Sequence, residues 1–219
     1  RYFIKPNFTF ARNKIEYTNE IDWGKNTWRQ ATGKPMNSNF TYVFDHFVAN
    51  QAEADALNAS GIQGSFGKLI PGDVVYKDMN GDKVIDDKDR AAQGYPRCPE
   101  IMFGIPMGFS YKGFDFSILF QGATNSSILL NGAAVYDFPN FHNDKMGKVK
   151  PMHLKRWTPE TAENAKYPAL HLGTHNNNKN VHSSLFLYDA SYVRLKNIEI
   201  GYSLPYQLIK VANLQQVRF

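Results

Sequence analysis

The chain reads FGIPMGFSYKGFDFSILFQ from Phe103 to Gln121. On both sides of Lys112-Gly113, large apolar residues alternate with residues that are mostly small or polar, which predicts two β-strands with one apolar face each. A two-residue turn at Lys112-Gly113 would place both apolar sets on the same face of a β-hairpin. The apolar set is Phe103, Ile105, Met107, Phe109, Tyr111, Phe114, Phe116, Ile118 and Phe120.

The apolar face of this hairpin fits two environments. In a soluble β-sandwich it would pack in the core, and the alternation alone agrees with that interpretation. Two details favour a membrane: the apolar face carries a large side chain at nearly every position, whereas the opposite face is small or polar, and a packed sandwich more often mixes sizes. We therefore predict that the apolar face contacts lipid, as in an outer-membrane β-barrel.

Connection lengths extend this prediction to the whole chain. Alternating patterns predict further strands within 2–10, 39–48, 191–204 and 214–219, and a short helix over 51–59. Short connections at 112–113 and 205–213 alternate with long ones at 39–101 and 122–190. Outer-membrane barrels have short periplasmic turns and long extracellular loops. The predicted fold class is therefore all-β, with antiparallel transmembrane β-barrel strands. If the number of strands within 123–190 is even, parity places both long connections on the extracellular side.

Composition limits the alternatives. The chain has 219 residues, is 42% hydrophobic and carries a net charge of +5, but its Lys and Arg residues are dispersed. We read that charge as a solvated surface and expect no nucleic-acid partner. The single cysteine, Cys98, excludes an internal disulfide framework. No apolar stretch reaches 18 residues, the minimum for a transmembrane helix.

A second informative stretch reads DMNGDKVIDDKD from Asp78 to Asp89. Side-chain oxygens stand at loop positions one, three, five, nine and twelve, a backbone carbonyl is available at position seven, and Ile85 can anchor the loop to a core. This spacing suits a hard cation such as Ca²⁺ in a structural role. The predicted ligands are Asp78, Asn80, Asp82, Val84, Asp86 and Asp89.

The loop departs from the usual calcium-binding pattern at two positions. Lys83 stands at position six, where Gly is usual, and Asp89 at position twelve is one methylene shorter than the usual Glu. The alternative is a solvated acidic turn that binds nothing, because Asp, Asn and Gly favour turns for local reasons. Five oxygen-bearing side chains in register favour the cation.

Aromatic residues in the 122–190 connection are candidates for substrate contact. Tyr136, Trp157 and Tyr167 could stack on sugar rings or line a partner interface, or they could simply pack the loop. Enzyme activity is not expected. The six histidines are scattered, and no HExxH, GxSxG or phosphate-binding loop is present.

Several segments resemble one known family. The segments PGDVVYKDMNGD (71–82), FSYKGFDFSILFQG (109–122) and DASYVRLKNIEIGYSLP (189–205), with NFTFARN (7–13) upstream, are similar in order and spacing to the C-terminal barrel portion of the SusC/RagA-like TonB-dependent transporters. The resemblance covers most of the chain and is weakest over 123–188. The family carries Gly where Lys83 stands.

This resemblance implies a plugged barrel of about 22 strands in the outer membrane of a Gram-negative bacterium. Residues 1–219 would form a C-terminal part of it, with the metal loop as an insertion at about 71–90 within an extracellular loop. Such transporters import oligosaccharides or peptides with a SusD-like surface lipoprotein as a lid, and TonB supplies energy through an N-terminal region that this chain lacks. The alternative function is a soluble, calcium-stabilised extracellular β-module that binds carbohydrate, and a requirement for detergent distinguishes the two.

Overall fold

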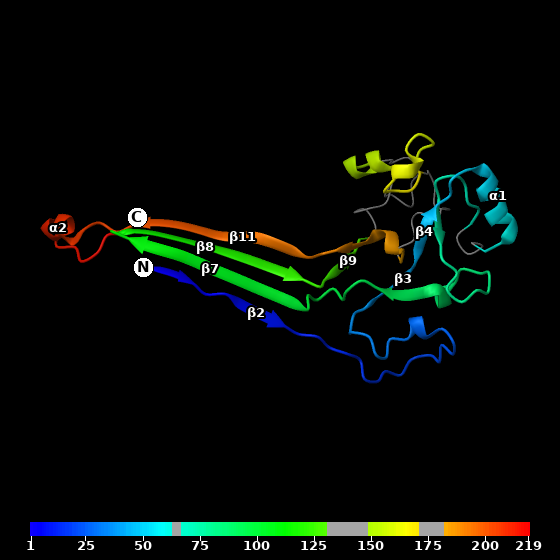
Figure 1. Ribbon diagram of the computed structural model, residues 1–219, viewed down its shortest axis with the longest axis horizontal. Coiled ribbons are helices and arrows are strands. Elements are labelled where there is room, and N and C mark those ends of the chain that lie inside the picture. The colour runs from blue at the N-terminus through cyan, green and yellow to red at the C-terminus, as the bar shows by residue number, and fades with distance from the viewer. Residues whose placement is uncertain (63–66, 131–148, 171–181) are drawn as a thin grey trace. The chain divides into compact units, whose positions relative to one another are not determined.

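The computed structural model describes residues 1–62, 67–130, 149–170 and 182–219, and these residues form two compact units (Figure 1). The first, which we call the sheet unit, contains residues 1–13, 97–127 and 189–219. The second, the loop unit, contains the described residues within 14–96 and 128–188. Each unit is described by itself below.

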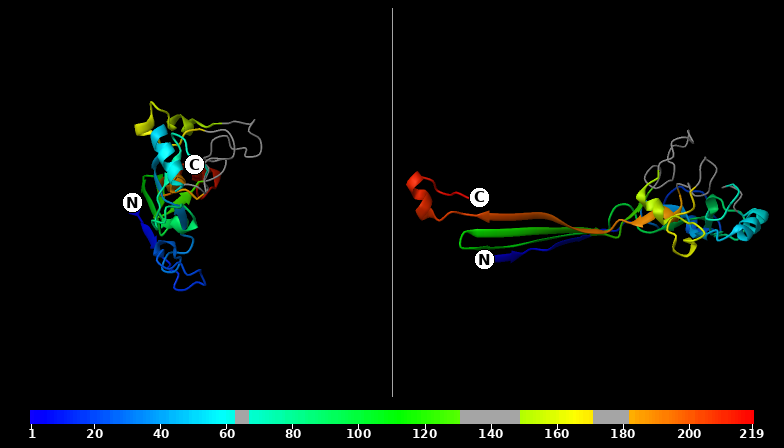
Figure 2. Two further views of the ribbon diagram at one scale, coloured as in Figure 1. Left: turned by 90° about the vertical axis from the view of Figure 1, so that its right-hand side faces the viewer. Right: turned by 90° about the horizontal axis from the view of Figure 1, so that it is seen from above.

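The sheet unit is one antiparallel sheet. Its strands are β1 (Tyr2–Ile4), β2 (Asn7–Phe10), β7 (Ile101–Tyr111), β8 (Phe114–Thr124) and β11 (Tyr192–Tyr202). Strands β1 and β2 both pair with β7, which pairs with β8, and β8 pairs with β11. Figure 2 shows the β7–β8 hairpin, in green, and β11, in orange, running side by side along their length. The predicted hairpin is confirmed.

The hairpin turn has the backbone that its sequence predicts. Lys112 and Gly113 both have positive φ angles, of 48° and 86°, as in the two-residue turns whose twist matches that of the flanking strands. The backbone N–H of Ser203 donates to the Gly113 carbonyl at 2.7 Å. A Cβ at Gly113 would lie 2.6 Å from the Ser203 carbonyl oxygen, so glycine is required for this contact as well as for its φ angle.

Beyond β11 the chain makes a short helical turn and comes back. Helix α2 (Tyr206–Ile209) and the 3₁₀ turn η9 (Lys210–Ala212) form this connection. Phe219 exchanges two backbone hydrogen bonds with Tyr202, at 3.0 and 3.1 Å. The strand predicted over 214–219 is therefore wrong: the segment forms no strand, and its pairing beside β11 is limited to an isolated antiparallel bridge between Ser203 and Arg218.

The loop unit consists of short ribbons and turns. Its strands are β3 (Asn39–Tyr42), β4 (Phe44–Phe47), β5 (Val74–Tyr76) and β6 (Arg90–Gln93). Two more strands, β9 (Ser127–Leu129) and β10 (Leu187–Asp189), belong to it except for one end residue each, Ser127 and Asp189, which are in the sheet unit. Helix α1 spans Gln51–Ser60, as predicted. The 3₁₀ turns are η1 (Thr27–Arg29), η3 (Asp87–Asp89), η5 (Pro151–Lys155), η6 (Ala162–Asn164) and η8 (Ser184–Phe186).

The single strand expected over 39–48 is wrong in one respect. It is divided at Val43 into β3, which pairs with β6, and β4, which pairs with β5. Alternation of apolar residues continues across Val43, so the pattern carried no sign that the two halves have different partners. The alternation of apolar residues shows which side chains of a strand share a face, but it does not show which strand pairs with it.

Small apolar clusters hold the loop unit together. In one, Ala54 of α1 packs with Val48, Leu69 and Val75. In another, Ile85 of the acidic loop packs with Val74 and Tyr76, and Ile85 is fully buried, as expected for the residue that anchors the loop. Among the described residues, none of the helices has both the length and the apolar character needed to span a membrane.

Candidate functional site

The sheet unit has one continuous apolar face. The register places Ile105 opposite Phe120, and Phe109 opposite Phe116, so the predicted apolar set lies on one side of the hairpin. Cross-strand partners extend this face over the neighbouring strands. The added residues are Tyr2, Ile4, Phe8 and Phe10 of β1 and β2, with Val193, Leu195, Ile198, Ile200 and Tyr202 of β11.

A β-bulge keeps β11 in phase with this face. The register shifts between Leu195 and Asn197, so Lys196 is the extra residue. Apolar residues stand at odd positions before it and at even positions after it, and the bulge brings both sets to the same side. Ile198 and Ile200 are 56% and 66% exposed in this chain. A continuous exposed apolar face of this kind marks a surface that contacts a membrane or another protein segment.

The opposite face of the sheet is mostly polar or small, although Phe3, Met102 and Leu119 also lie on it. Arg194 of β11 donates to Gln121 of β8 at 3.1 Å, and Ser117 lies 3.4 Å from Glu199. Arg218 pairs with Asp115 on the same side. We call this the polar face. An apolar face opposite a mostly polar one is the pattern of strands in a membrane barrel with an aqueous interior.

Strand length and end residues agree with a membrane wall. Strands β7, β8 and β11 each have 11 residues, and a tilted strand needs about 9–11 to cross the hydrocarbon core. Beside the hairpin turn, Tyr111, Phe114 and Tyr202 are cross-strand neighbours. Aromatic rows of this kind flank the apolar band of membrane barrels. Sequence reasoning missed this row, which is visible only once the register is known.

The end of the sheet opposite the turn is closed by an ion pair that the sequence did not reveal. Arg12, after β2, donates to both carboxylate oxygens of Glu100 at 2.8 and 2.7 Å, and Asn125, after β8, donates to one of them at 3.1 Å. The Arg12 guanidinium, more than the Asn125 amide, holds the pKa of Glu100 below its usual value. These residues are 88 and 25 positions apart, so no local spacing could have predicted them.

Both long connections leave the sheet from this same end. Residue 11 follows β2 and residue 100 precedes β7, which pair antiparallel. The first connection therefore spans 11–100 and not 39–101 as predicted, because β3 and β4 do not join this sheet. Thr124 ends β8 opposite the start of β11 at Tyr192, since these strands also pair antiparallel. Among the described residues of the second connection, β9 and β10 pair with each other rather than joining the sheet. The parity argument that placed both connections on one side therefore holds.

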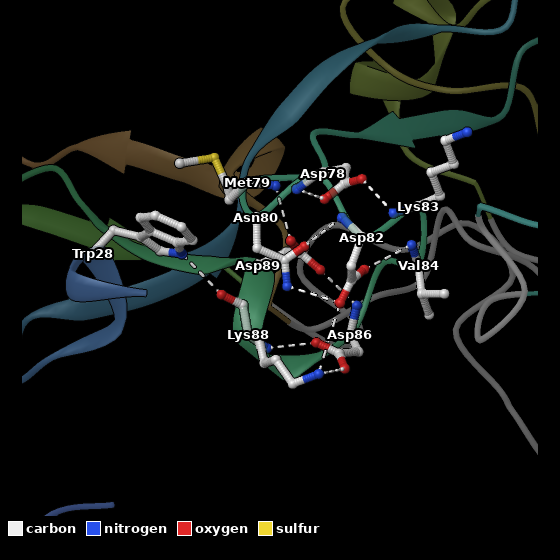
Figure 3. Close-up of polar contacts among 11 residues, drawn as sticks. Trp28, Asp78, Met79, Asn80, Asp82, Lys83, Val84, Asp86, Lys88 and Asp89 are labelled. Atoms are coloured by element: carbon white, nitrogen blue, oxygen red, sulfur yellow. Dashed lines mark hydrogen bonds and ion pairs between the residues drawn. The ribbon is translucent and has the colours of Figure 1, made fainter. Parts of the chain in front are cut away.

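The acidic loop folds through its own carboxylates (Figure 3). Asp78 accepts from the backbone N–H groups of Gly81 and Lys83 at 2.6 and 2.8 Å. Asn80 accepts from the backbone of Asp82, which in turn accepts from that of Val84, both at 2.9 Å. These side chain–backbone bonds curl the loop locally.

Asp89 closes the loop from its far end. Its two oxygens accept from the backbone N–H groups of Met79 and Asp86, both at 2.8 Å, and it is fully buried. Burial raises the pKa of Asp89 against the opposing effect of these hydrogen bonds. Met79 and Asp86 stand at loop positions two and nine, so one carboxylate joins both halves of the loop.

Cationic side chains take different positions around this loop. The Lys88 ammonium lies 3.3 Å from Asp86 and 3.7 Å from Asp82. Lys83 adopts φ of 66° and its side chain is directed away from Asp82 and Asp86 (Figure 3). Thus position six has the left-handed backbone that Gly supplies in a calcium loop, with lysine in its place.

The predicted metal ligands lie on one loop, and their oxygens are of the kind that Ca²⁺ prefers. Within the residues that the structure describes, no group of three or more His, Cys, Asp or Glu side chains is placed to hold a metal ion. Side-chain rotation would be needed for these carboxylates to share one ion. The chemistry of the donor set fits a calcium ion, while its present geometry is that of a loop held by hydrogen bonds.

A neighbouring segment docks on the end of the loop through contacts that the sequence did not reveal. Trp28 donates its indole N–H to the Lys88 carbonyl at 2.8 Å, and Arg29 pairs with Asp87 at 2.8 Å. The Arg29 guanidinium also lies over the rings of Trp23 and Phe40, at 4.6 and 5.1 Å from their centroids. Trp28 and Arg29, both on η1, thus fix where the loop ends.

The candidate substrate residues have different environments. Tyr136 lies outside the described residues. Trp157 is only 8% exposed and its ring covers Gly72, where a Cβ would lie 2.5 Å from the indole. The Tyr167 hydroxyl lies 3.0 Å from that of Tyr188, and burial raises the pKa of Tyr167. Trp157 therefore packs the loop unit, and substrate contact by these residues stays a prediction.

Together, the two-faced antiparallel sheet and its long connections are of the kind found in the walls of β-barrel membrane proteins. No protein-family model matches the chain. In sequence it is similar to "TonB-dependent receptor P26" and "TonB-dependent receptor P3" of Formosa agariphila, at 28% identity over 73% of this chain and 30% over 69%. It is also similar to "TonB-dependent receptor SusC" of Bacteroides thetaiotaomicron, at 25% over 86%.

Solved structures agree on the fold. The chain matches "Structure of the RagAB peptide transporter" with a TM-score of 0.65, at 18% identity over 99% of this chain and 22% of that chain. It also matches the RagAB peptide importer in the 'open-open' state with a TM-score of 0.61, at 17% identity over 95% and 20% of the two chains. The resemblance to the SusC/RagA-like TonB-dependent transporters and the all-β, antiparallel fold class are thus confirmed. The chain spans about one-seventh of the length of the curated relatives that it matches, 14–16%.

Proposed function

We propose that this chain forms part of the barrel wall of an outer-membrane importer that moves oligosaccharides or peptides into the periplasm. The observation that carries the proposal is the two-faced sheet, with exposed apolar residues on one side and paired polar residues on the other. Lipid would contact the apolar face and the aqueous interior the polar face. Relatives named as TonB-dependent receptors and a fold shared with a peptide transporter support import as the activity.

The partners of this importer follow from the same relatives. We include a SusD-like surface lipoprotein as the lid and TonB as the source of energy, in the outer membrane of a Gram-negative bacterium. The loop unit, on long connections that leave one end of the sheet, would lie outside the cell. No catalytic step is proposed, because the relatives are named as receptors and transporters.

Uptake by whole cells tests this proposal. Cells with and without the receptor are given a panel of labelled oligosaccharides and oligopeptides, and a strain that lacks TonB serves as the control for energy dependence. We expect one of the two classes to accumulate only in cells that have both the receptor and TonB. Equal uptake of every compound in all three strains would contradict import. Purification without detergent would contradict the membrane wall and favour a soluble carbohydrate-binding module.

For the acidic loop we propose a structural Ca²⁺ ion held by Asp78, Asn80, Asp82, Asp86 and Asp89 with the Val84 carbonyl. The donor set and spacing support this role, and Ca²⁺ would offset the repulsion between neighbouring carboxylates. Calorimetric titration of the chelator-treated receptor with Ca²⁺ tests it. Asp82→Asn should weaken binding, whereas Asp55→Asn on helix α1 should leave it unchanged. If the wild-type receptor gave no more binding heat than the Asp82→Asn variant, the site would be refuted.

A further inference from the structure

His46 on β4 contacts a carboxylate with each of its ring nitrogens. Its Nδ1 lies 2.8 Å from Asp45 Oδ2, and its Nε2 lies 2.7 Å from Glu53 Oε1. A neutral imidazole has one N–H, so it can donate to only one of these oxygens. The other contact would then set a nitrogen lone pair against a carboxylate. This geometry is satisfied only by the imidazolium, in which both nitrogens donate.

The surrounding charges balance only when His46 is protonated. Asp45 also faces the Lys77 ammonium, at 3.4 Å, and Glu53 also accepts from the Ala49 backbone at 2.7 Å. The four groups are two carboxylates, one ammonium and the imidazole. With a charged imidazole their sum is zero, and with a neutral one it is −1. The pair contacts are partly exposed, so their strength is reduced by solvent.

Glu53 lies in the first turn of α1, and this gives the cluster a structural consequence. The helix begins after Asn50, whose side chain accepts from the Glu53 backbone at 3.0 Å. His46 thus joins the start of α1 to strand β4. Ala54, one residue later, is buried in a core cluster. Loss of the His46 contact would therefore loosen the first turn without displacing the rest of the helix.

We propose that His46 is a pH-dependent latch, which holds the first turn of α1 on β4 while the imidazole is charged and releases it on deprotonation. The inference is independent of the proposed function. Burial lowers the pKa of His46, but hydrogen bonds and charges from Glu53 and Asp45 outweigh it and raise this pKa overall. The stabilisation is therefore complete below the unfolded value of about 6.5, and it is lost as pH rises through the folded value.

Hydrogen exchange measured by mass spectrometry on the intact receptor in detergent tests the latch. Exchange of peptides covering residues 49–54 is followed from about pH 5.5 to about pH 9, with correction for the intrinsic rates. We expect protection to fall about threefold as pH rises, a size typical of partly exposed charge pairs. A flat profile in the wild-type protein would overturn the proposal.

Two variants separate the latch from a general effect of pH. His46→Gln should give the lower protection at every pH, because its amide carries no titrating charge. Asp55→Asn neutralises the carboxylate that accepts from the Gln51 side chain on the same helix, at 2.9 Å, and does not touch the cluster. It should keep the wild-type pH profile. The same pH dependence in His46→Gln as in the wild type would also overturn the proposal.

Discussion

At the scale of single residues, Lys83 carries a cost that glycine would avoid. Its φ of 66° places a side chain in the left-handed region, at about 1–2 kcal/mol. Lys83→Gly should make the loop open less often, with exchange of the Gly81 and Val84 amides slowed about fivefold, the factor that about 1 kcal/mol represents. Lys83→Ala is the control, since it removes the charge and keeps the Cβ. Equal effects of the two variants would show that the charge matters and the backbone does not.

Lys88 is the residue that competes with a cation in the acidic loop. Its ammonium lies between Asp82 and Asp86, two of the predicted ligands, at 3.7 and 3.3 Å. We expect Lys88→Gln to lower the Kd for Ca²⁺ a few-fold in calorimetry, because the ion would no longer displace an ammonium. Lys83→Gln should leave the Kd nearly unchanged, since its side chain is directed away. Weaker binding by Lys88→Gln would mean that Lys88 orders the ligands instead.

At the scale of elements, the two faces of the β7–β8 hairpin should respond in opposite ways to charge. Met107 lies on the apolar face opposite Ile118, near the middle of the strand, and Met107→Arg should destabilise the folded barrel by about 2–4 kcal/mol. Ser117 lies on the polar face, 3.4 Å from Glu199, so Ser117→Arg should be tolerated. Heat-modified gel mobility and urea unfolding in lipid vesicles measure both. Comparable losses for the two variants would contradict a lipid-facing side.

The hairpin was predictable because its determinants are local. The alternation of apolar residues determines which side chains share a face, and the two-residue turn at Lys112-Gly113 determines the register, all within 19 residues of sequence. The bulge at Lys196 left a trace, the change of phase between Leu195 and Ile198, which could have been read as a bulge. Pairing between segments far apart in the sequence left no such trace. The division at Val43 and the Arg12–Glu100 pair depend on partners elsewhere in the chain, and single-sequence periodicity contains no information on them.

The candidate site was predictable in its chemistry and not in its geometry. The acidic loop's oxygen spacing identified the residues that curl it, because each accepts from a backbone group two to five positions away. The contacts of the loop with Trp28 and Arg29, about 60 residues upstream, could not be predicted from any local sequence pattern. Aromatic residues such as Trp157 are ambiguous for the same reason, since an exposed stacking ring and a buried packing ring have the same sequence signature.

At the scale of the whole molecule, the single cysteine offers a direct test of orientation. Cys98 is exposed and lies three residues before β7, at the end of the sheet from which both long connections leave. Lys112 lies at the other end, in the hairpin turn. If the long connections are extracellular, a membrane-impermeant maleimide should label Cys98 on intact cells. The Cys98→Ser variant, which lacks this thiol, measures the background labelling of any other thiols in the receptor.

The turn provides the matched position for that experiment. In a Cys98→Ser background, Lys112→Cys should react only after the outer membrane is permeabilised, because short turns face the periplasm in such barrels. Labelling in detergent confirms that both thiols are chemically competent. The reverse pattern, with Lys112→Cys labelled on intact cells and Cys98 only after permeabilisation, would invert the barrel. It would then place the acidic loop in the periplasm, where it could meet neither an external substrate nor a surface lipoprotein.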